Sequence, residues 1–515
     1  MRKNYAVPFF LLFSLVLAAQ TWAQSISGKV VDENNQPLPG VAVLVVGTSM
    51  GIATDFDGKY SLTNLKAGEA TLQFTFIGYK KFTKKVTVGS GNVTVNVKLE
   101  VEANELDEVI VVGYGVQRKR DMTGSVVSLK SKDLTDIPTP SFQNAIQGKA
   151  SGVQVITGSG LAGSGSMVRV RGVASISAGG DPLYVVDGIP ITQDNFLDGN
   201  RGGFNANPLA SINPSDIESI EILKDAAATG IYGSRGSNGV VLITTKRGKR
   251  NSGLNFTFSS RVGLTQPTAL PNMMNTSQYL QMYEEAWVND GNVGTPKNLP
   301  GGIAWEDASN TNTNWVDETV HTGVKQKYDF GVTKGGEKYN LYGGLSYQND
   351  QSYLKGNSYD RFAGRFNVDY NLSKRLKLGL STSLSQGKNH RIDAAWSGGL
   401  GAAMSTALPI FPVYDANGDY WVGAGINNNP VAARENRDWV AREVRSINNV
   451  SLEYKPINNL VLRFQGSYDY MDYRDERYEA PIFDLQNVQD GVLYGKAYLK
   501  PFFVNNVSGY GTASY

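Results

Sequence analysis

The feature that most constrains this chain is a sustained alternation of apolar and polar residues that begins at Leu254 and recurs toward the end of the sequence. Successive side chains of a β-strand point to opposite faces, so each alternating run predicts a strand with one apolar and one polar face. In one such run, Phe362 and Phe366 alternate with Arg361 and Arg365. Runs of this kind, apolar outward and polar inward, are typical of transmembrane β-barrel strands.

The connections between these runs support a barrel. Short turns are expected at residues 334–338, 371–374 and 455–458, and long connections at 266–325, 387–447 and 471–496. Periplasmic turns and extracellular loops of outer-membrane barrels alternate in this way. We therefore expect residues 251–515 to form about eight strands of a partial antiparallel barrel, with 505–515 as the last strand.

Composition excludes several classes of function. The net charge of +2 is close to neutral, and no basic block suits nucleic acid. Cysteine is absent, which removes disulfides and cysteine-based metal sites. The two histidines, His321 and His390, match no metal-binding spacing, and no catalytic motif such as G-x-S-x-G is present. We expect no enzyme activity, no metal or other cofactor, and no nucleic-acid partner.

Residues 1–23 predict a cleaved signal peptide. Arg2 and Lys3 supply positive charge, an apolar run follows, and Thr21-Trp22-Ala23 offers a small-x-small cleavage site before Gln24. The apolar run is short for a membrane span, which disfavours the alternative of a retained anchor. The mature chain is expected to be exported.

Residues 24–100 predict a small β-sandwich of immunoglobulin or transthyretin type. Short strands alternate with turn signals, and the expected strands are 26–31, 41–46, 60–62, 70–76 and 93–99. Asp55 and Asp57 are expected in a turn rather than at a metal, because the segment contains no histidine.

Residues 101–115 predict a linker that contains one strand. Four acidic residues make it poorly suited to a core, yet the run Val109–Val112 is β-branched and a flexible Gly113-Tyr114-Gly115 follows. Such a segment can pair its backbone with the exposed edge of a partner's sheet. The alternative is an edge strand of the preceding sandwich.

Residues 116–250 predict an α+β fold. Asp187-Gly188 is a two-residue hairpin signal after the expected strand 183–186. A second strand, 217–223, is expected to lead into the helix 225–231, with the Asp225 carboxylate accepting hydrogen bonds from the first turn. Glycines then interrupt regular structure before a buried strand over 239–245.

The earlier part of this α+β region contains a G-x-G-x-x-G string at Gly158–Gly163. This string indicates a dinucleotide site only where a helix follows a strand. Here the run MVRVRG follows and predicts a strand, so a mobile glycine-rich loop is expected instead. Arg169 and Arg171 on that strand are expected to pair with carboxylates of the same α+β region, and contact with an anionic group is the alternative.

Three phrases carry a family resemblance: LDEVIVVGYG, LYVVDGIPI and IESIEILKDAAATGIYGSRGSNGVVLITTKRG. With them the chain, from about Ser25 to its last residue, resembles the SusC/RagA family of TonB-dependent outer-membrane transporters. The resemblance implies a carboxypeptidase-regulatory-like domain at 24–100. It also implies that residues 116–250 form a plug domain, with a plug motif formed by Asp187, Gly188, Asp225, Gly230, Tyr232, Gly233, Arg235, Gly236 and Gly239.

The resemblance further implies partners and a mechanism. The segment on which the energy-transducing TonB complex would pull, the TonB box, matches Leu106, Asp107, Glu108, Val109, Ile110, Val111 and Val112. Family members lie in the lipid of the outer membrane and pair with a SusD-like surface lipoprotein. The implied cargo is an oligosaccharide, or else a peptide. A signalling receptor and an adhesive or structural surface protein are the alternatives.

The resemblance also implies a plugged barrel of about 22 strands. Eight strands close too narrow a barrel to contain a plug, and an open sheet would expose unpaired edges to lipid. This sequence is therefore expected to be the N-terminal part of a longer chain.

The long connections contain candidate ligand contacts. Flat aromatic side chains beside many Asn, Asp and Gly residues suit sugars and peptides alike, and the candidates are Trp305, Trp315, Trp396, Trp421 and Trp439. The alternative for each tryptophan is packing within its loop or at the membrane interface. Residues 415–419 resemble a calcium loop, but the glycine is misplaced for one, so a turn is expected.

Overall fold

The structure, a computed structural model, describes most of the chain. The described residues are 24–33, 35–48, 50–65, 68–89, 91–100, 109–112, 115–118, 125–135, 141–158, 160–173, 179–192, 209–393, 399–457, 459–484, 488–489 and 491–515. The predicted signal peptide lies outside them. The chain divides into two compact units, residues 1–110 with 117–122 and residues 111–116 with 123–515. Among the described residues, no helix is long and apolar enough to cross a membrane.

The first unit contains two small sheets whose inner faces share one core. One sheet has the order β4-β1-β7, with β8 also paired to β1, and the other has the order β3-β2-β5-β6. The rings of Tyr60 and Phe74 pack edge to face in this core, with their centroids 5.6 Å apart. The strands are β1 (Ser25–Val31), β2 (Ala42–Val45), β3 (Gly51–Ala53), β4 (Lys59–Leu62), β5 (Gly68–Thr75), β6 (Phe82–Val88), β7 (Asn92–Thr94) and β8 (Val97–Lys98).

A turn in this unit confirms the sequence-based interpretation of its acidic residues. The Asp55 carboxylate accepts hydrogen bonds from the backbone N–H groups of Asp57 and Lys59, at 3.0 and 2.7 Å. Asp57 in turn pairs with the Lys59 side chain at 3.4 Å. Both carboxylates therefore shape the turn before β4.

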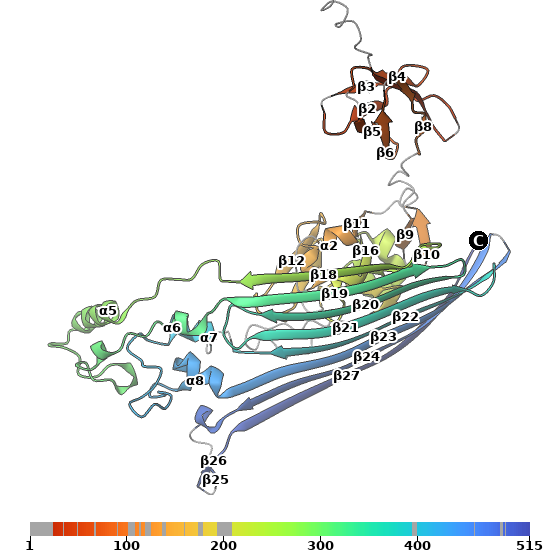
Figure 1. Cartoon of the computed structure of the whole chain (residues 1–515). Coiled ribbons are helices and arrows are strands. Elements are labelled where there is room, and N and C mark those ends of the chain that lie inside the picture. The colour runs from red at the N-terminus through yellow and green to blue at the C-terminus, as the bar shows by residue number, and fades with distance from the viewer. Residues whose placement is uncertain are drawn as a thin grey trace, which may run out of the picture. The chain divides into compact units, whose positions relative to one another are not determined.

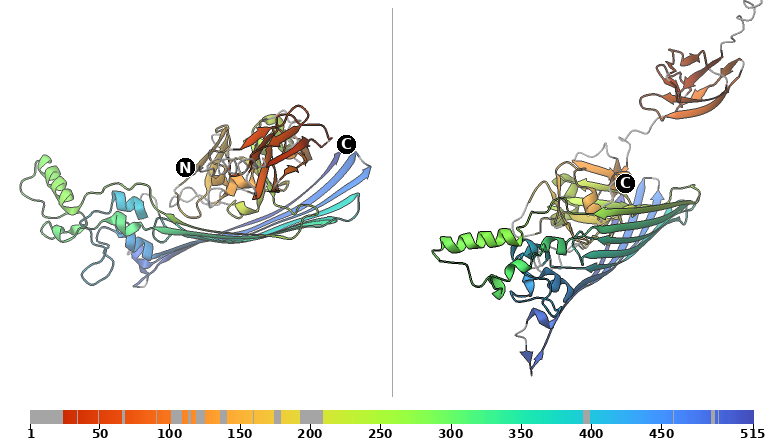
Figure 2. Two further views of the ribbon diagram at one scale, coloured as in Figure 1. Left: turned by 45° about the horizontal axis from the view of Figure 1, so that its top comes forward. Right: turned by 60° about the vertical axis from the view of Figure 1, so that its left-hand side comes forward.

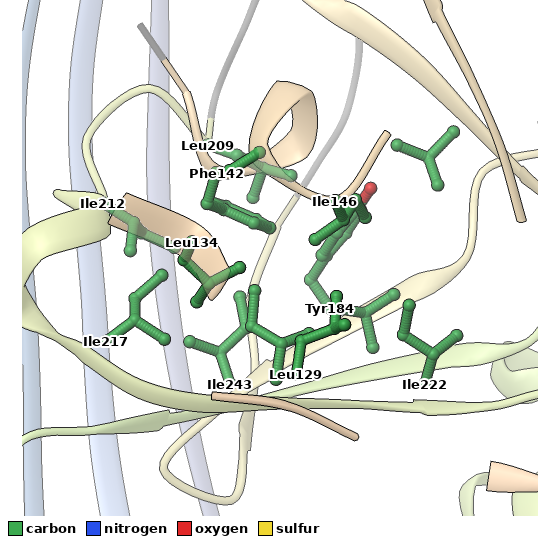
Figure 3. Packing of buried hydrophobic residues seen from close by; sticks show 14 of the residues in the cluster. Leu129, Leu134, Phe142, Ile146, Tyr184, Leu209, Ile212, Ile217, Ile222 and Ile243 are labelled. Carbon is green, nitrogen blue, oxygen red and sulfur yellow. The ribbon is translucent and has the colours of Figure 1, made fainter. Parts of the chain in front are cut away.

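The plug domain is built on a mixed five-stranded sheet with the order β11-β16-β17-β14-β15. Two short helices cover it, and Figure 3 shows their apolar side chains pointing toward those of the sheet. The elements are β11 (Val126–Lys130), α2 (Ser131–Thr135), α3 (Phe142–Ala145), β12 (Val153–Thr157), β13 (Ser166–Val170), β14 (Leu183–Val186), β15 (Ile189–Pro190), β16 (Ile217–Leu223), α4 (Ala226–Thr229) and β17 (Val240–Thr245).

Eight antiparallel strands form one curved sheet, which we call the wall (Figure 1). Each strand pairs with the next in sequence, so the topology is a simple meander. The expected eight strands are confirmed. They are β18 (Asn255–Thr265), β19 (Gly323–Gly335), β20 (Tyr339–Gln351), β21 (Ser358–Asn371), β22 (Leu376–His390), β23 (Arg437–Ile457), β24 (Leu460–Glu479) and β27 (Lys496–Ser514).

The two faces of the wall differ as the alternation predicts. On β21, Arg361 and Arg365 are 1% and 7% exposed, whereas Phe362 and Phe366 are 55% and 41% exposed. The polar residues lie under the plug domain, which covers the concave face in both views of Figure 2. The apolar residues form the outer face.

Several strands are longer than expected. The connections expected at residues 387–447 and 471–496 occupy only 391–436 and 480–495, because β23 and β24 extend to 21 and 20 residues. The last strand, β27, likewise begins at Lys496 and not near residue 505. The predicted strands were too short because the outer face becomes polar toward the long connections. Arg442 of β23 forms an ion pair there with Glu476 of β24 at 3.3 Å, so apolar and polar residues no longer alternate along the strand.

The two longest connections pack together beyond one end of the wall (Figure 1). Their helices are α5 (Thr276–Asn289), α6 (Trp315–Thr319), α7 (Gly399–Ser405) and α8 (Pro430–Glu435). Phe411, Trp315 and Ile410 are central to an apolar cluster that joins them. The remaining strands are the pairs β9 (Val109–Val112) with β10 (Gly115–Arg118), and β25 (Val488–Gln489) with β26 (Val492–Leu493).

Candidate functional site: the plug domain and its contacts with the wall

The Asp187-Gly188 turn joins β14 to β15 as the sequence predicts. Both residues have positive φ, 49° and 88°, which is what a two-residue hairpin turn of this hand requires. The Asp187 carboxylate accepts hydrogen bonds from the N–H and the hydroxyl of Thr245, at 3.0 and 2.7 Å. A Cβ at position 188 would lie 2.7 Å from the Tyr510 hydroxyl oxygen, so glycine is also needed for the close approach to the wall.

The same turn contacts four neighbouring strands of the wall. Its Asp187 carboxylate faces Arg365 of β21 at 3.6 Å and accepts a hydrogen bond from Ser381 of β22 at 3.3 Å. The Asp187 carbonyl accepts from Asn449 of β23 at 3.5 Å and from Gln465 of β24 at 2.8 Å. Asp187, whose backbone is in the left-handed region, thus attaches the plug domain to the middle of the wall.

A second contact is made by the 3₁₀ turn Pro214–Asp216, which precedes β16. Asn213 and Ser215 both donate to the Asp329 carboxylate, at 3.0 and 2.9 Å. Asp216 accepts from the Tyr342 hydroxyl at 2.6 Å and lies 3.9 Å from the Arg365 guanidinium. Arg365 therefore stands between two plug carboxylates, and buried charges require such pairing.

Further polar contacts extend from the ends of the plug strands. Asn367 donates to the Thr245 hydroxyl at 2.9 Å and to the Lys246 carbonyl at 2.7 Å. Arg445 forms an ion pair with Asp469 at 2.8 Å and also donates to a plug carbonyl, that of Thr192, at 3.2 Å. Both Arg445 and Asp469 are only 1% exposed.

A cavity of about 250 Å³ remains between β17 and the wall. Its lining includes the ion pair of Lys377 with Asp369 at 3.2 Å, together with Glu453 and Arg463. Plug and wall are therefore joined by discrete polar contacts that surround this cavity.

The other predicted plug-motif residues lie away from this contact, between α4 and β17. Tyr232 is buried, whereas Arg235 is exposed. The helix is shorter than expected, because a 3₁₀ segment begins at Gly230 and Gly233 adopts φ 60° and ψ −145°. Glycine is required at two further positions: a Cβ at Gly236 would lie 2.9 Å from the Thr229 carbonyl oxygen, and Gly239 has φ 89°.

Asp225 corrects one prediction. It occupies the N-cap position of α4 with extended backbone, but its side chain makes no capping hydrogen bond. The carboxylate instead accepts from the Ser125 N–H at 2.5 Å and forms an ion pair with Arg171. These contacts, the Ser125 N–H first, hold the pKa of the Asp225 carboxyl below its ordinary value. The Asp225 carboxylate therefore contacts donors distant in sequence and not the N–H groups of the first turn of α4.

The glycine-rich string connects β12 to β13, so the strand expected after it is confirmed. Its described part is anchored, in contrast to the mobile loop expected: the Ala162 N–H donates to Asn357 at 2.8 Å, and Ala162 is buried. Arg169 pairs with Asp181 at 2.5 Å. With the Arg171 contact to Asp225, this confirms that both arginines pair with plug carboxylates.

The TonB-box prediction falls partly on described residues. Leu106, Asp107 and Glu108 lie outside them. The run Val109–Val112 forms β9, which pairs with β10 and, within the described chain, with no strand of the sandwich. The expected strand is present, and its role in partner binding stays a prediction.

Three of the candidate tryptophans belong to one apolar cluster of the long connections. Trp439 lies not in a connection but in β23, where its indole N–H donates to Asp475 at 2.6 Å. Trp315 is 3% exposed and donates to the Leu408 carbonyl at 2.8 Å, so it packs within the loop cluster rather than presenting a ligand surface. Trp421 lies 4.7 Å from Phe411, ring to ring, and Trp305 is half-buried against the same cluster. Trp396 lies outside the described residues.

Residues 415–419 form a turn, as expected. The Asp415 carboxylate accepts from the backbone N–H groups of Asn417 and Asp419, at 2.9 and 3.0 Å. Within the described residues, no group of His, Cys, Asp or Glu is arranged to hold a metal ion.

Comparison with known families matches both domains before the wall. A model described as "CarboxypepD_reg-like domain" matches residues 26–111, and one described as "TonB-dependent Receptor Plug Domain" matches residues 118–240. "TonB-dependent receptor P26" of Formosa agariphila is 34% identical over 467 residues, which cover 89% of this chain and 44% of that protein. "TonB-dependent receptor SusC" of Bacteroides thetaiotaomicron is 32% identical over 480 residues, 88% of this chain and 45% of that protein.

The chain belongs to the SusC/RagA family of TonB-dependent transporters. One solved structure supports this SusC/RagA assignment, and a second supports the fold alone. The RagAB peptide importer in its closed-closed state is 25% identical with a TM-score of 0.62, covering 76% of this chain and 45% of that chain. The open-open state gives 24% identity and a TM-score of 0.64, with 79% and 46% covered. The chain spans about half the length of these relatives.

Proposed function

We propose that this protein imports a large nutrient across the outer membrane, driven by TonB. The observation that carries the proposal is the plug domain, which lies on the polar face of the wall and is fixed there by discrete contacts centred on Asp187 and Arg365. Such contacts hold a closed state that a pulling force can release. An oligosaccharide is the preferred cargo, and a peptide is the second, since a relative in structure is a peptide importer.

The proposal includes two partners. The segment Leu106–Val112 serves as the TonB box, for which the β-strand formed by Val109–Val112 provides the backbone conformation needed for strand addition. A SusD-like surface lipoprotein covers the outer end, where the long connections gather. The signal peptide directs export and is cleaved before Gln24, and the mature chain resides in the outer membrane. Its parts are the sandwich (24–100), the linker (101–115), the plug (116–250) and the partial barrel (251–515).

The decisive experiment replaces Ile110 with proline in the full-length protein. Proline removes a backbone donor and disfavours a paired strand, so uptake of the natural nutrient should fall to the level of a strain lacking TonB. Ile110→Val, which keeps a β-branched residue, is the matched control and should import normally. Normal uptake by Ile110→Pro, with the protein present in the outer membrane, would contradict this TonB-box mechanism.

A second experiment identifies the partners and cargo. The full-length protein is purified from outer membranes in mild detergent, and co-purifying proteins and small molecules are identified by mass spectrometry. A stoichiometric lipoprotein with a bound sugar or peptide is expected. An anti-sigma regulator in its place would support a signalling receptor.

A further inference from the structure

A second cavity, of about 330 Å³, lies against β18, β19 and β20 toward the end of the wall where the long connections begin. Arg261, Lys325 and Lys327 line it, with Asp350 as its carboxylate. Among the residues that the structure describes, neither Arg261 nor Lys325 forms an ion pair. Within the described residues, the cavity therefore contains positive charge that has no ion-pair partner.

The strand register concentrates this charge. Arg261 pairs across the sheet with Lys327, and Lys327 with Gln348, which in turn faces Arg361 on β21. Like charges directly opposite each other destabilise a sheet, so the arrangement has a cost in stability. On the inner face of these four strands the nearby carboxylates are Asp329 and Asp350, and Asp329 already accepts from Asn213 and Ser215 of the plug.

A buried polar group in the cavity wall indicates what else the site binds. Gln348 is 2% exposed, and its Nε2 donates to Asp350 at 2.6 Å, but among the residues with described positions its Oε1 has no hydrogen-bond partner. The hydroxyl oxygen of Thr265, which also lines the cavity, has none either. A buried acceptor without a donor is costly, so the fitting occupant offers O–H or N–H donors beside its charge.

We propose that this cavity is a subsite for a carboxylate-bearing part of the cargo, in which Arg261 and Lys325 bind the carboxylate and Gln348 accepts from a neighbouring donor. This inference rests on the proposed import function and specifies its substrate class. Two sources share the chemistry: a uronic acid has hydroxyls beside its carboxylate, and an acidic peptide has backbone N–H groups beside its carboxylates.

The test measures binding to the full-length protein in detergent by calorimetry, with four probes. These are an oligogalacturonate, its methyl ester, a glutamate-rich peptide and the corresponding glutamine peptide. One acidic probe should bind, and should bind more tightly than its neutral counterpart. In the Arg261→Gln/Lys325→Gln variant its Kd should rise about tenfold or more, since charge-assisted hydrogen bonds are lost, while neutral probes are unaffected.

The matched control is Lys334→Gln/Lys338→Gln, which removes the same charge from the exposed turn at the other end of β19 and β20. It should bind as the unmodified protein does. Which acidic probe responds identifies the source of the carboxylate. Equal binding of acidic and neutral probes, no binding of either acidic probe, or an equal loss in the control would overturn the subsite. Import itself is judged separately, by the Ile110→Pro uptake experiment.

Discussion

The core of the plug domain and its contact with the wall are built from opposite chemistry. The core is apolar: Phe142, Ile220 and Val241 are fully buried among other hydrophobic side chains, and the wall contributes only Ile447 to this cluster among the described residues. The contact is polar, and it consists of charges and amides such as Asp187, Arg365 and Asn367.

The difference teaches how a plug can be firmly folded and yet releasable. Apolar burial has no substitute in water, so the core resists unfolding. Water can replace the partners of a polar contact, and each such hydrogen bond contributes only about 0.5–1.5 kcal/mol net. A force applied to the plug should therefore separate it from the wall before its core opens.

The largest expected loss of stability, in the core or in the contact, is that of Phe142→Ala. Phe142 is 0% exposed and meets Tyr184 edge to face at 5.8 Å. Removing a buried ring leaves a cavity and costs about 3–5 kcal/mol. Amide hydrogen exchange of β16, which lies between β11 and β17 in the plug sheet, should accelerate correspondingly in the full-length protein.

The control for this variant is Ile231→Ala in the same domain, at a residue that is 57% exposed. Exposed substitutions of this kind change stability by less than about 0.5 kcal/mol. Unchanged exchange of β16 in Phe142→Ala would mean that the wall, and not the core, orders the plug.

Arg365→Leu tests the polar side and should have a smaller effect. It leaves the carboxylates of Asp187 and Asp216 without their cation, but Thr245 and Tyr342 still donate to them. We expect a loss of about 2–3 kcal/mol in plug attachment. The exchange of β16 should stay slow while the contact loosens, which is the reverse of the Phe142→Ala result.

Cysteine labelling measures that loosening, because this chain contains no cysteine. Ser385→Cys, on the inner face of β22 and 6% exposed, should react faster with a thiol reagent when Arg365→Leu is also present. Arg442→Leu, which removes an arginine that is half exposed on the outer face, is the control and should not change labelling. If β16 exchange and labelling accelerate together, core and contact form one cooperative unit and the contrast fails.

Local patterns predicted the fold where one face of an element is uniformly apolar. The strands around Phe362 and Phe366 and the Asp187-Gly188 hairpin follow from rules of period and turn that involve neighbouring residues only. The full lengths of β23 and β24 did not follow. Beyond the apolar band the outer face also carries charges, such as Arg442 and Glu476, so the alternation disappears although the strand pairing continues.

The candidate site was less predictable for a different reason. The sequence identified Asp187 as a turn residue, but its partner Arg365 lies far away in the chain, and a local signal does not select it from the other inward arginines. Asp225 shows the same limit. Its carboxylate was expected to cap the helix that follows, but it instead accepts a hydrogen bond from the Ser125 N–H, 100 residues earlier, and forms an ion pair with Arg171.

The smallest predicted effect concerns Asp225 and its dependence on pH. Because the Ser125 N–H and the Arg171 guanidinium lower the pKa of this carboxyl from its ordinary 3.8, the ionised form stabilises the plug domain above that value. The stabilisation is lost as the pH falls through the lowered pKa of the folded state. In thermal unfolding followed by circular dichroism, Asp225→Asn should melt below the unmodified protein at neutral pH, and the gap should narrow as the pH falls below 3.8. A gap that is constant or widens on acidification would show that the carboxylate charge does not hold this edge of the plug, and that the domain depends there on its apolar core alone.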